Sequence, residues 1–109
     1  FIGGKLSTYA EPSFSSSSHL SKLLLAAHTK DPLTRSIMNI RHSEDIFLAI
    51  KKAKLSYTIL DQEYGFSQKK CDILIHKGGF GIEPSTYILG KDAEDTIKKC
   101  QKIATAAKN

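Results

Sequence analysis

Apolar side chains follow two different periods along this 109-residue chain. Three segments repeat them every three or four residues, which predicts amphipathic helices. These helices are expected over Ser18 to Thr29, in the segment that follows Ser43, and over Ala93 to Ala106. Ser43 and Asp92 are expected as N-caps, because a short polar side chain there can accept a hydrogen bond from a first-turn N–H group. The residues expected to face the core are Leu20, Leu23, Leu24 and Ala27 in the first helix, Ile46, Phe47, Ala49, Ile50 and Ala53 in the second, and Ile97, Cys100, Ile103 and Ala104 in the third.

Shorter segments rich in β-branched and aromatic residues predict strands between these helices. Cys71 to His76 is an almost continuous apolar run, which is typical of a central strand buried on both faces. Alternating strands and helices indicate a single α/β domain over residues 1–109, a three-layer α/β/α arrangement with a mixed, mostly parallel sheet. The short connection after His76 predicts one antiparallel pair. The predicted strands are Lys5 to Ala10, Arg35 to Arg41, Leu55 to Leu60, Cys71 to His76 and Ser85 to Leu89.

A serine cluster at the start of the first predicted helix is a candidate anion site. Ser16, Ser17 and Ser18 come directly before His19. Their hydroxyls, the first-turn N–H groups and the positive end of the helix dipole can bind a phosphate together, with His19 in the first turn facing it. A serine N-cap beside a surface histidine explains the same residues without a ligand, and for this stretch alone it is the more common case.

Polar residues at the ends of two predicted strands form a second candidate region. Arg41-His42 and the segment from His76 to Gly79 lie where strands end, and ligands of mostly parallel sheets gather at the carboxyl ends of strands. We therefore expect Arg41, Lys77, the serine cluster and the glycine loop to converge on one phosphate-bearing ligand.

The glycine loop and Asn39 each allow two interpretations. Gly78, Gly79 and Gly81 permit a ligand to approach the backbone closely, but a tight connection between two strands uses the same residues. Asn39 stands in the middle of a predicted strand, where Asn is depleted. Its side chain either contacts a ligand or satisfies a neighbouring loop.

Composition narrows the classes of function. The net charge of +5 is spread along the chain, which suits anionic small ligands or weak nucleic-acid binding and establishes neither. The 4 histidines show no metal-ligand spacing, and no nucleophile triad can be assembled. Cys71 and Cys100 are expected as free thiols in a reducing cytoplasm, with a disulfide between them as the minor alternative. No apolar run suits a membrane span and no signal-peptide pattern is recognised, so no membrane partner is expected.

Several blocks of this sequence, taken together, resemble the ThiN-type thiamine-phosphate synthase domain. They are S-S-S-H-L at 16–20, D-P-L-T-R-S-I-M-N-I-R-H-S-E at 31–44, C-D-I-L-I-H-K-G-G-F-G-I-E-P at 71–84 and T-Y-I-L-G at 86–90. Their order and spacing match over nearly the whole chain, and that combination is much more specific than any single block. The resemblance implies a three-layer α/β domain like the C-terminal part of archaeal and bacterial hydroxymethylpyrimidine-phosphate kinases.

The resemblance also implies an activity, a cofactor and a set of site residues. The reaction couples hydroxymethylpyrimidine pyrophosphate with thiazole phosphate, both phosphorylated small molecules, and gives thiamine phosphate and pyrophosphate. Such chemistry needs charge stabilisation of the leaving pyrophosphate rather than a protein nucleophile, and Mg²⁺ is the expected cofactor. His19 matches the family histidine and is the expected catalytic residue. Arg35, Asn39, Gly78, Gly81 and Glu83 match family motifs and join the residues expected from the serine cluster and the strand ends. The expected substrate-binding residues are therefore Ser16, Ser17, Ser18, Arg35, Asn39, Arg41, Gly78, Gly79, Gly81 and Glu83.

The chain departs from the family pattern in three respects. Family domains are longer, so the chain is expected to be a C-terminal portion, with a kinase or DNA-binding domain upstream and with self-association into a homo-oligomer. A functional arginine of the family is expected to precede Phe1, and many members carry an acidic residue where this chain has His76 or Lys77. The alternative function is a non-catalytic thiamine-phosphate sensor of a transcriptional repressor, although His19 favours the enzyme. A structural fragment without a ligand is the third and least favoured interpretation.

Overall fold

The computed structural model of the chain describes residues 14–60, 70–78 and 83–108. Four of the predicted strands are confirmed, although those predicted over Leu55 to Leu60 and Cys71 to His76 are shorter than expected. The remaining one, Lys5 to Ala10, lies outside the described residues. In chain order the elements are helix α1 (Phe14–Lys30), strand β1 (Ser36–Arg41), helix α2 (Glu44–Lys52), strands β2 (Tyr57–Ile59), β3 (Ile73–His76) and β4 (Ser85–Gly90), and helix α3 (Ala93–Ala107).

The four strands form one sheet in the order β1-β4-β3-β2. β4 pairs with β1 and with β3 in the antiparallel sense, whereas β2 and β3 pair in parallel. The mixed sheet and the antiparallel pair after His76 are therefore confirmed. The mostly parallel pairing needs correction: β1, β2 and β3 run in one direction, but the reversed β4 lies between β1 and β3. The short connection after β3 makes β4 return beside it, which leaves one parallel pairing among the three.

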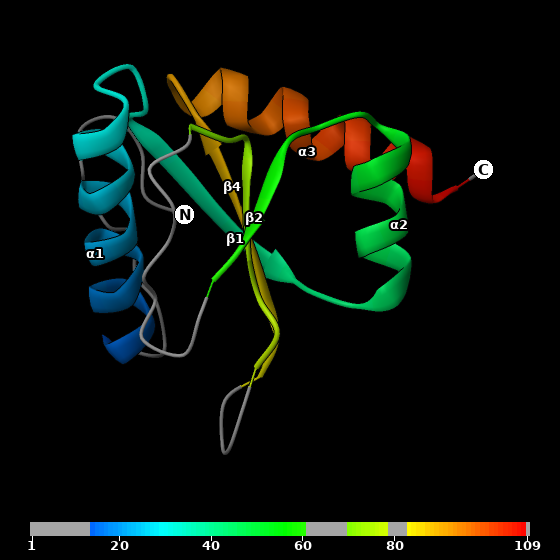
Figure 1. Ribbon diagram of the computed structural model, residues 1–109, viewed down its shortest axis with the longest axis horizontal. Coiled ribbons are helices and arrows are strands. Elements are labelled where there is room, and N and C mark those ends of the chain that lie inside the picture. Colours follow the sequence, from blue (N-terminus) through cyan, green and yellow to red (C-terminus); the bar gives the residue numbers. More distant parts are fainter. Residues whose placement is uncertain (1–13, 61–69, 79–82, 109) are drawn as a thin grey trace.

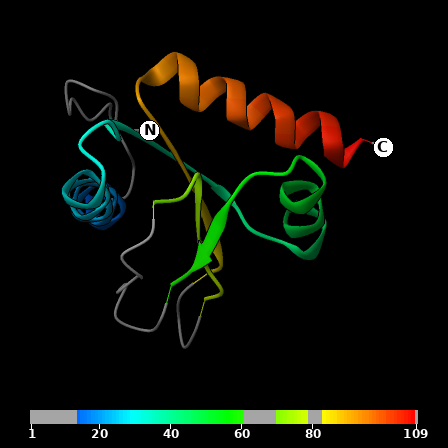
Figure 2. The same ribbon diagram turned by 45° about the horizontal axis from the view of Figure 1, so that its top comes forward.

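Helices cover both faces of the sheet, which confirms the three-layer α/β/α arrangement. α1 lies on one side, and α2 and α3 lie together on the other side (Figures 1 and 2). Two buried clusters correspond to these two interfaces, because apolar side chains alternate between the faces of each strand. The cluster under α1 contains Leu20, Leu23, Leu24, Ala27, Ile37, Leu60, Leu74, Tyr87 and Leu89, and the cluster under α2 and α3 contains Ala49, Ile50, Ile73, Ile75, Ile88 and Ile103.

β3 is the buried central strand that the apolar run predicts. Ile73, Leu74 and Ile75 are fully buried, and His76 ends the strand with 5% of its surface exposed. Ile73 and Ile75 face α2 and α3, while Leu74 faces α1. Both faces of β3 therefore contribute to the core.

The ends of α2 and α3 follow the predicted caps, whereas the start of α1 does not. Ser43 Oγ accepts a hydrogen bond from the Ile46 N–H at 3.2 Å, and Asp92 Oδ1 accepts one from the Asp95 N–H at 2.8 Å. α1 begins at Phe14, so the predicted start at Ser18 is wrong. Serine has a moderate helix propensity, and the serine run lies within the first turns of the helix instead of preceding its start.

α3 is rotated relative to the predicted buried face. Ile103 is buried as expected and Cys100 is partly buried, but Ile97 is exposed and Ala104 lies on the surface. Thr96 is fully buried in their place, with its hydroxyl donating to the Asp92 carbonyl at 2.9 Å. A polar residue satisfied within its own helix can take an inward position that the hydrophobic pattern does not reveal.

Candidate functional site

One edge of the sheet gathers polar residues at the ends of the strands. Because β1, β2 and β3 run in the same direction, their carboxyl ends meet at this edge, beside the start of β4. Arg41 pairs with Ser85, and Ser85 pairs with His76. These three residues form one row across three adjacent strands, and we call Arg41, Ser85 and His76 the strand-end row. Neighbouring strands lie about 4.8 Å apart, so one phosphorylated ligand can reach the whole row.

The strand-end row belongs to the face of the sheet that α1 covers. Ile37, Leu74 and Tyr87 pack in the cluster under α1. Residues separated by an even number of positions along a strand share a face, which places the row on the same side. The chain directions of α1 and β1 are opposite, so the first turns of α1 lie toward the same end of the molecule as this edge (Figure 1).

The connection after β3 fixes the ring of His76. The Gly78 N–H donates to His76 Nδ1 at 3.0 Å. Gly78 has φ 84°, a backbone conformation that favours glycine. Because Nδ1 accepts this bond, the neutral imidazole carries its proton on Nε2. In that tautomer Nε2 is the nitrogen of the buried His76 ring that can donate a hydrogen bond.

A second histidine supports the same edge from the opposite face. His42 Nδ1 lies 2.8 Å from Thr86 Oγ1, and Thr86 is fully buried. The ring of Phe47 in α2 meets the His42 ring edge-on, with 6.2 Å between the centroids. Burial lowers the pKa of His42, the positive charge of Lys77 lowers it further, and Glu44 partly opposes them. The neutral form of His42 is thus favoured in the folded protein.

Arg35 and Asn39 lie along β1 at different distances from the row. Arg35 precedes the strand, and its N–H donates to the Gly90 carbonyl at 2.9 Å, at the opposite end of β4. Arg35 and Arg41 are separated by about 20 Å along the strand at roughly 3.3 Å per residue. Asn39 pairs with Tyr87 and lies one step from the row on the same face. The fold therefore brings Asn39 and Arg41 together and leaves Arg35 at the other end.

The remaining predicted site residues are placed only in part. Ser16, Ser17, Ser18 and His19 belong to α1, and their side chains lie outside the described part of the structure. Since α1 begins at Phe14, His19 falls in the second turn and not in the first turn as expected. Gly79 and Gly81 lie outside the described residues. Glu83 is exposed and stands two residues before Ser85.

The carboxylates and thiols of the described residues are the candidates for metal binding and for nucleophilic chemistry. These residues contain no group of three or more His, Cys, Asp or Glu that could hold a metal ion. Mg²⁺ often uses only one or two carboxylates together with substrate phosphates, and the exposed carboxylate of Glu83 beside the row fits such a role. Cys71 and Cys100 are free thiols, as predicted. Burial raises the pKa of Cys71, so this thiol is not activated as a nucleophile.

Comparison with known families assigns this chain. The profile of the family described as thiamine-phosphate synthase ThiN matches residues 1–102. The chain belongs to the ThiN family. This ThiN-family chain is 29% identical to the bifunctional thiamine biosynthesis protein ThiDN of Methanocaldococcus jannaschii, over 83% of the chain and 25% of that protein. It is 26% identical to the thiamine-phosphate synthase ThiN of Methanothermobacter thermautotrophicus, over 92% of the chain and 64% of that protein.

Solved structures show the same fold. The C-terminal domain of protein MJ0236 superposes with a TM-score of 0.75 at 25% identity, covering 98% of this ThiN-family chain and 69% of that structure. The C-terminal domain of a phosphomethylpyrimidine kinase superposes with a TM-score of 0.66 at 19% identity, over 78% of this chain and 60% of that one. The chain thus spans 25% of the length of the first curated relative and 64% of the length of the second. Its similarity supports a role in thiamine biosynthesis.

Two features of this ThiN-family site escaped the sequence analysis. The contact between His42 and Thr86 joins residues 44 positions apart, and His42 is not among the expected substrate-binding residues. The sequence predicts Ser85 as the start of a strand and not as a site residue. Both features involve polar residues at the ends of predicted strands, Arg41-His42 and Ser85-Thr86. Their pairing depends on the strand order, which the sequence does not reveal.

None of the helices in the described residues is long and apolar enough to cross a membrane.

Proposed function

We propose that this ThiN-family domain is a thiamine-phosphate synthase, which joins hydroxymethylpyrimidine pyrophosphate to thiazole phosphate and releases pyrophosphate. The observation that carries the proposal is the strand-end row, in which a guanidinium, a hydroxyl and a histidine stand in register on one face. Arg41 suits bidentate binding of phosphate oxygens, and His76 offers a donor at Nε2. Family membership adds the chemistry to which these donors are suited.

The proposed reaction needs positioned positive charge more than it needs a nucleophilic side chain. The bond between the methylene carbon of the pyrimidine and the pyrophosphate oxygen breaks, and its electron pair leaves with pyrophosphate. The lone pair of the thiazole nitrogen then forms the new C–N bond to the pyrimidinylmethyl cation. Negative charge grows on the leaving group, so preorganised hydrogen-bond donors lower the barrier.

The residues have separate roles in this proposal. Arg41 and Ser85 bind and orient phosphate oxygens at the sheet edge. His76, with Nδ1 held by Gly78, directs its Nε2 proton to the same ligand. His19 and the serines Ser16, Ser17 and Ser18 add donors from the first turns of α1, toward the same end of the molecule (Figure 1). Asn39 contacts the neutral part of a substrate, one step further along β1.

Mg²⁺ is proposed to enter with the pyrophosphate. When bound, Mg²⁺ supplies further charge neutralisation for the leaving group. Glu83, exposed beside Ser85, is the described carboxylate that we propose as a ligand. The phosphate oxygens of the substrate would complete the coordination, as is usual for this ion.

A synthase assay combined with calorimetry tests the proposal. The chain is incubated with both substrates and Mg²⁺, and thiamine phosphate is measured after oxidation to its fluorescent thiochrome product. Titration of the same sample with thiamine phosphate measures product binding independently. Turnover that depends on Arg41 and His76 supports the synthase. Binding without turnover would support a thiamine-phosphate sensor in its place, and the absence of both would contradict the assignment of this edge as the site.

A further inference from the structure

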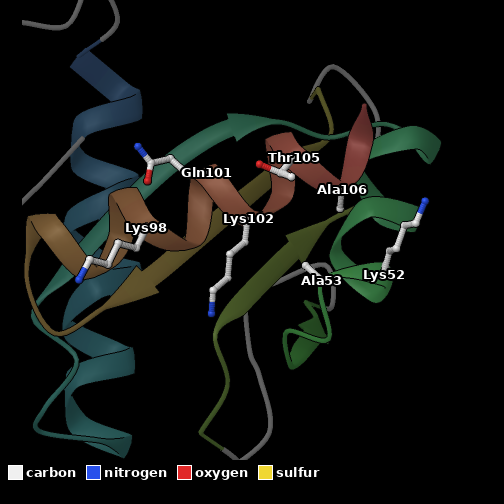
Figure 3. A pocket seen from close by; sticks show the side chains of 7 residues that line it. All are labelled: Lys52, Ala53, Lys98, Gln101, Lys102, Thr105 and Ala106. Atoms are coloured by element: carbon white, nitrogen blue, oxygen red, sulfur yellow. The ribbon is translucent and has the colours of Figure 1, made fainter. Parts of the chain in front are cut away.

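A groove of about 560 Å³ lies along the outer side of the seam between α2 and α3 (Figure 3). Ala53 and Ala106 form its apolar floor, and Lys52, Lys98 and Lys102 rise around it. A second hollow of about 370 Å³ shares Lys52 and Ala106 with the first, and Asp45 is the acidic residue in its lining. The two hollows are therefore neighbours, and we call them together the channel. They lie on the layer that faces away from α1 and from the strand-end row.

The charges around this channel are spread along its length. Figure 3 shows that the side chains of Lys52, Lys98 and Lys102 point in different directions from two helices. Ammonium groups that are spread in this way match several separate negative charges better than they match one phosphate group. Lys98 has an exposed partner, Glu94, at 3.5 Å, and such an exposed ion pair is weak enough to exchange for another carboxylate. An extended partner with several negative charges matches the arrangement.

The floor of the channel adds an apolar requirement. Ala53 and Ala106 are small, so a partner can approach the two helix backbones closely. Leu48 lines the second hollow and is 53% exposed, which provides an apolar contact at one end. An amphipathic helix laid in a groove satisfies both requirements, with an apolar stripe on the floor and acidic residues at the rim. Single-stranded nucleic acid fits less well, because it commonly stacks on aromatic side chains and no such residue lines the channel among the described residues.

We propose that the channel between α2 and α3 binds an acidic amphipathic helix of another protein. Lys52 and Lys102 contact carboxylates on the two sides of that helix, and Ala53 and Ala106 receive its apolar stripe. This inference does not depend on the proposed synthase activity, because the channel and the strand-end row lie on different layers of the fold.

A designed peptide provides the probe. A fluorescently labelled helical peptide carries leucine and alanine on one stripe and glutamate on both flanks, and its binding is measured by anisotropy. Lys102→Glu should weaken binding by about three- to tenfold, as expected for reversing one exposed charge contact. Lys22→Glu, which changes an exposed lysine on α1, is the matched control and should leave the affinity unchanged.

Filling the floor separates groove binding from general charge attraction. Ala106→Arg adds a positive charge but occupies the floor, so binding in the groove predicts weaker binding and simple attraction predicts stronger binding. Ala104→Arg adds the same charge at an exposed position of α3 that does not line the channel, and it should not weaken binding. Amide NMR shifts on binding should centre on Ala53 and Ala106.

Several results would overturn the proposal. These are an absence of binding at millimolar peptide, equal effects of Lys102→Glu and Lys22→Glu, or tighter binding by Ala106→Arg. Concentration-dependent self-association abolished by Lys102→Glu would assign the channel to a second copy of this chain. Preferential binding of an oligonucleotide in the channel would assign it to nucleic acid.

Discussion

His42 Nδ1 and Thr86 Oγ1 lie 2.8 Å apart and join the end of β1 to the start of β4. Arg41 and Ser85 precede these residues in their strands and face the other side, where they belong to the strand-end row. This contact on the α2 side of the sheet therefore adds to the backbone pairing of β1 with β4, which places two residues of the candidate site side by side.

Thr86→Val should destabilise the protein, because it removes the hydroxyl that pairs with a partly buried imidazole while preserving the shape of the side chain. The expected loss is about 1 kcal/mol in the free energy of unfolding, measured by urea denaturation. Thr105→Val, at an exposed position of α3, is the control and should change stability by less than about 0.5 kcal/mol. Equal stabilities of Thr86→Val and the unchanged protein would show that the contact has no net effect.

Stability should fall on acidification through pH 6.5, the ordinary pKa of histidine, because the pKa of His42 is lowered in the folded state. The unfolded chain then binds more protons than the folded chain, so protonation favours unfolding. The contribution of neutral His42 is fully present above pH 6.5 and is lost as the pH falls toward its lower folded value. Urea denaturation on both sides of pH 6.5 measures this slope. His42→Gln should reduce it, and an unchanged slope would assign the effect to another group.

Arg41→Gln and Arg35→Gln form a matched pair on one strand. If the site lies at the strand-end row, Arg41→Gln should lower kcat/KM for thiamine-phosphate synthesis by about ten- to a hundredfold, the value of a lost charge-assisted phosphate contact. Arg35→Gln should change it by less than about threefold, because this residue lies about 20 Å further along β1. The family resemblance instead predicts a role for Arg35. Comparable losses in both variants would show that the substrate extends along the whole α1 face of β1.

Lys99 and Lys98 provide a second matched pair, in this case for stability. Lys99 Nζ lies 2.9 Å from Asp72 and donates to the Leu89 carbonyl at 2.7 Å, with 18% of its side chain exposed. Lys99→Met should cost about 2 kcal/mol, because it leaves Asp72 without its cation. Lys98→Met breaks only the exposed pair with Glu94 and should cost less than about 0.5 kcal/mol. Thermal denaturation of the two variants distinguishes them, and similar costs would contradict a bracing role for Lys99.

The same network predicts where acid begins to unfold the protein. Burial opposes ionisation of Asp72, but hydrogen bonds from Lys99 and Ser56 and the charge of Lys99 outweigh it, so the pKa of Asp72 is lowered. The corresponding stability is present above the ordinary pKa of 3.8 and is lost as the pH falls below it. This range lies well below that of His42, so the two effects can be measured separately.

Local patterns in the sequence determined most of the secondary structure. The apolar run within Cys71 to His76 predicts a strand buried on both faces, because the consecutive residues Ile73, Leu74 and Ile75 point to both sides of the sheet. Ser43 and Asp92 predict the starts of α2 and α3, since capping involves residues only three positions apart. The start of α1 was missed because serine is acceptable both in a cap and within a helix.

Tertiary structure decided what distant residues do together. The ends of β1 and β3 were expected to carry the site, but the sequence could not reveal that β4 lies between them and adds Ser85 to the row. Lys99 in α3 likewise reaches Asp72, a contact across 27 positions that no helical period contains. Hydrophobic periodicity and capping involve residues that are close in the sequence, so they can be predicted from the sequence alone. Strand order, register and the partner of a buried polar group depend on which segments meet, and for this chain only the folded arrangement determines that.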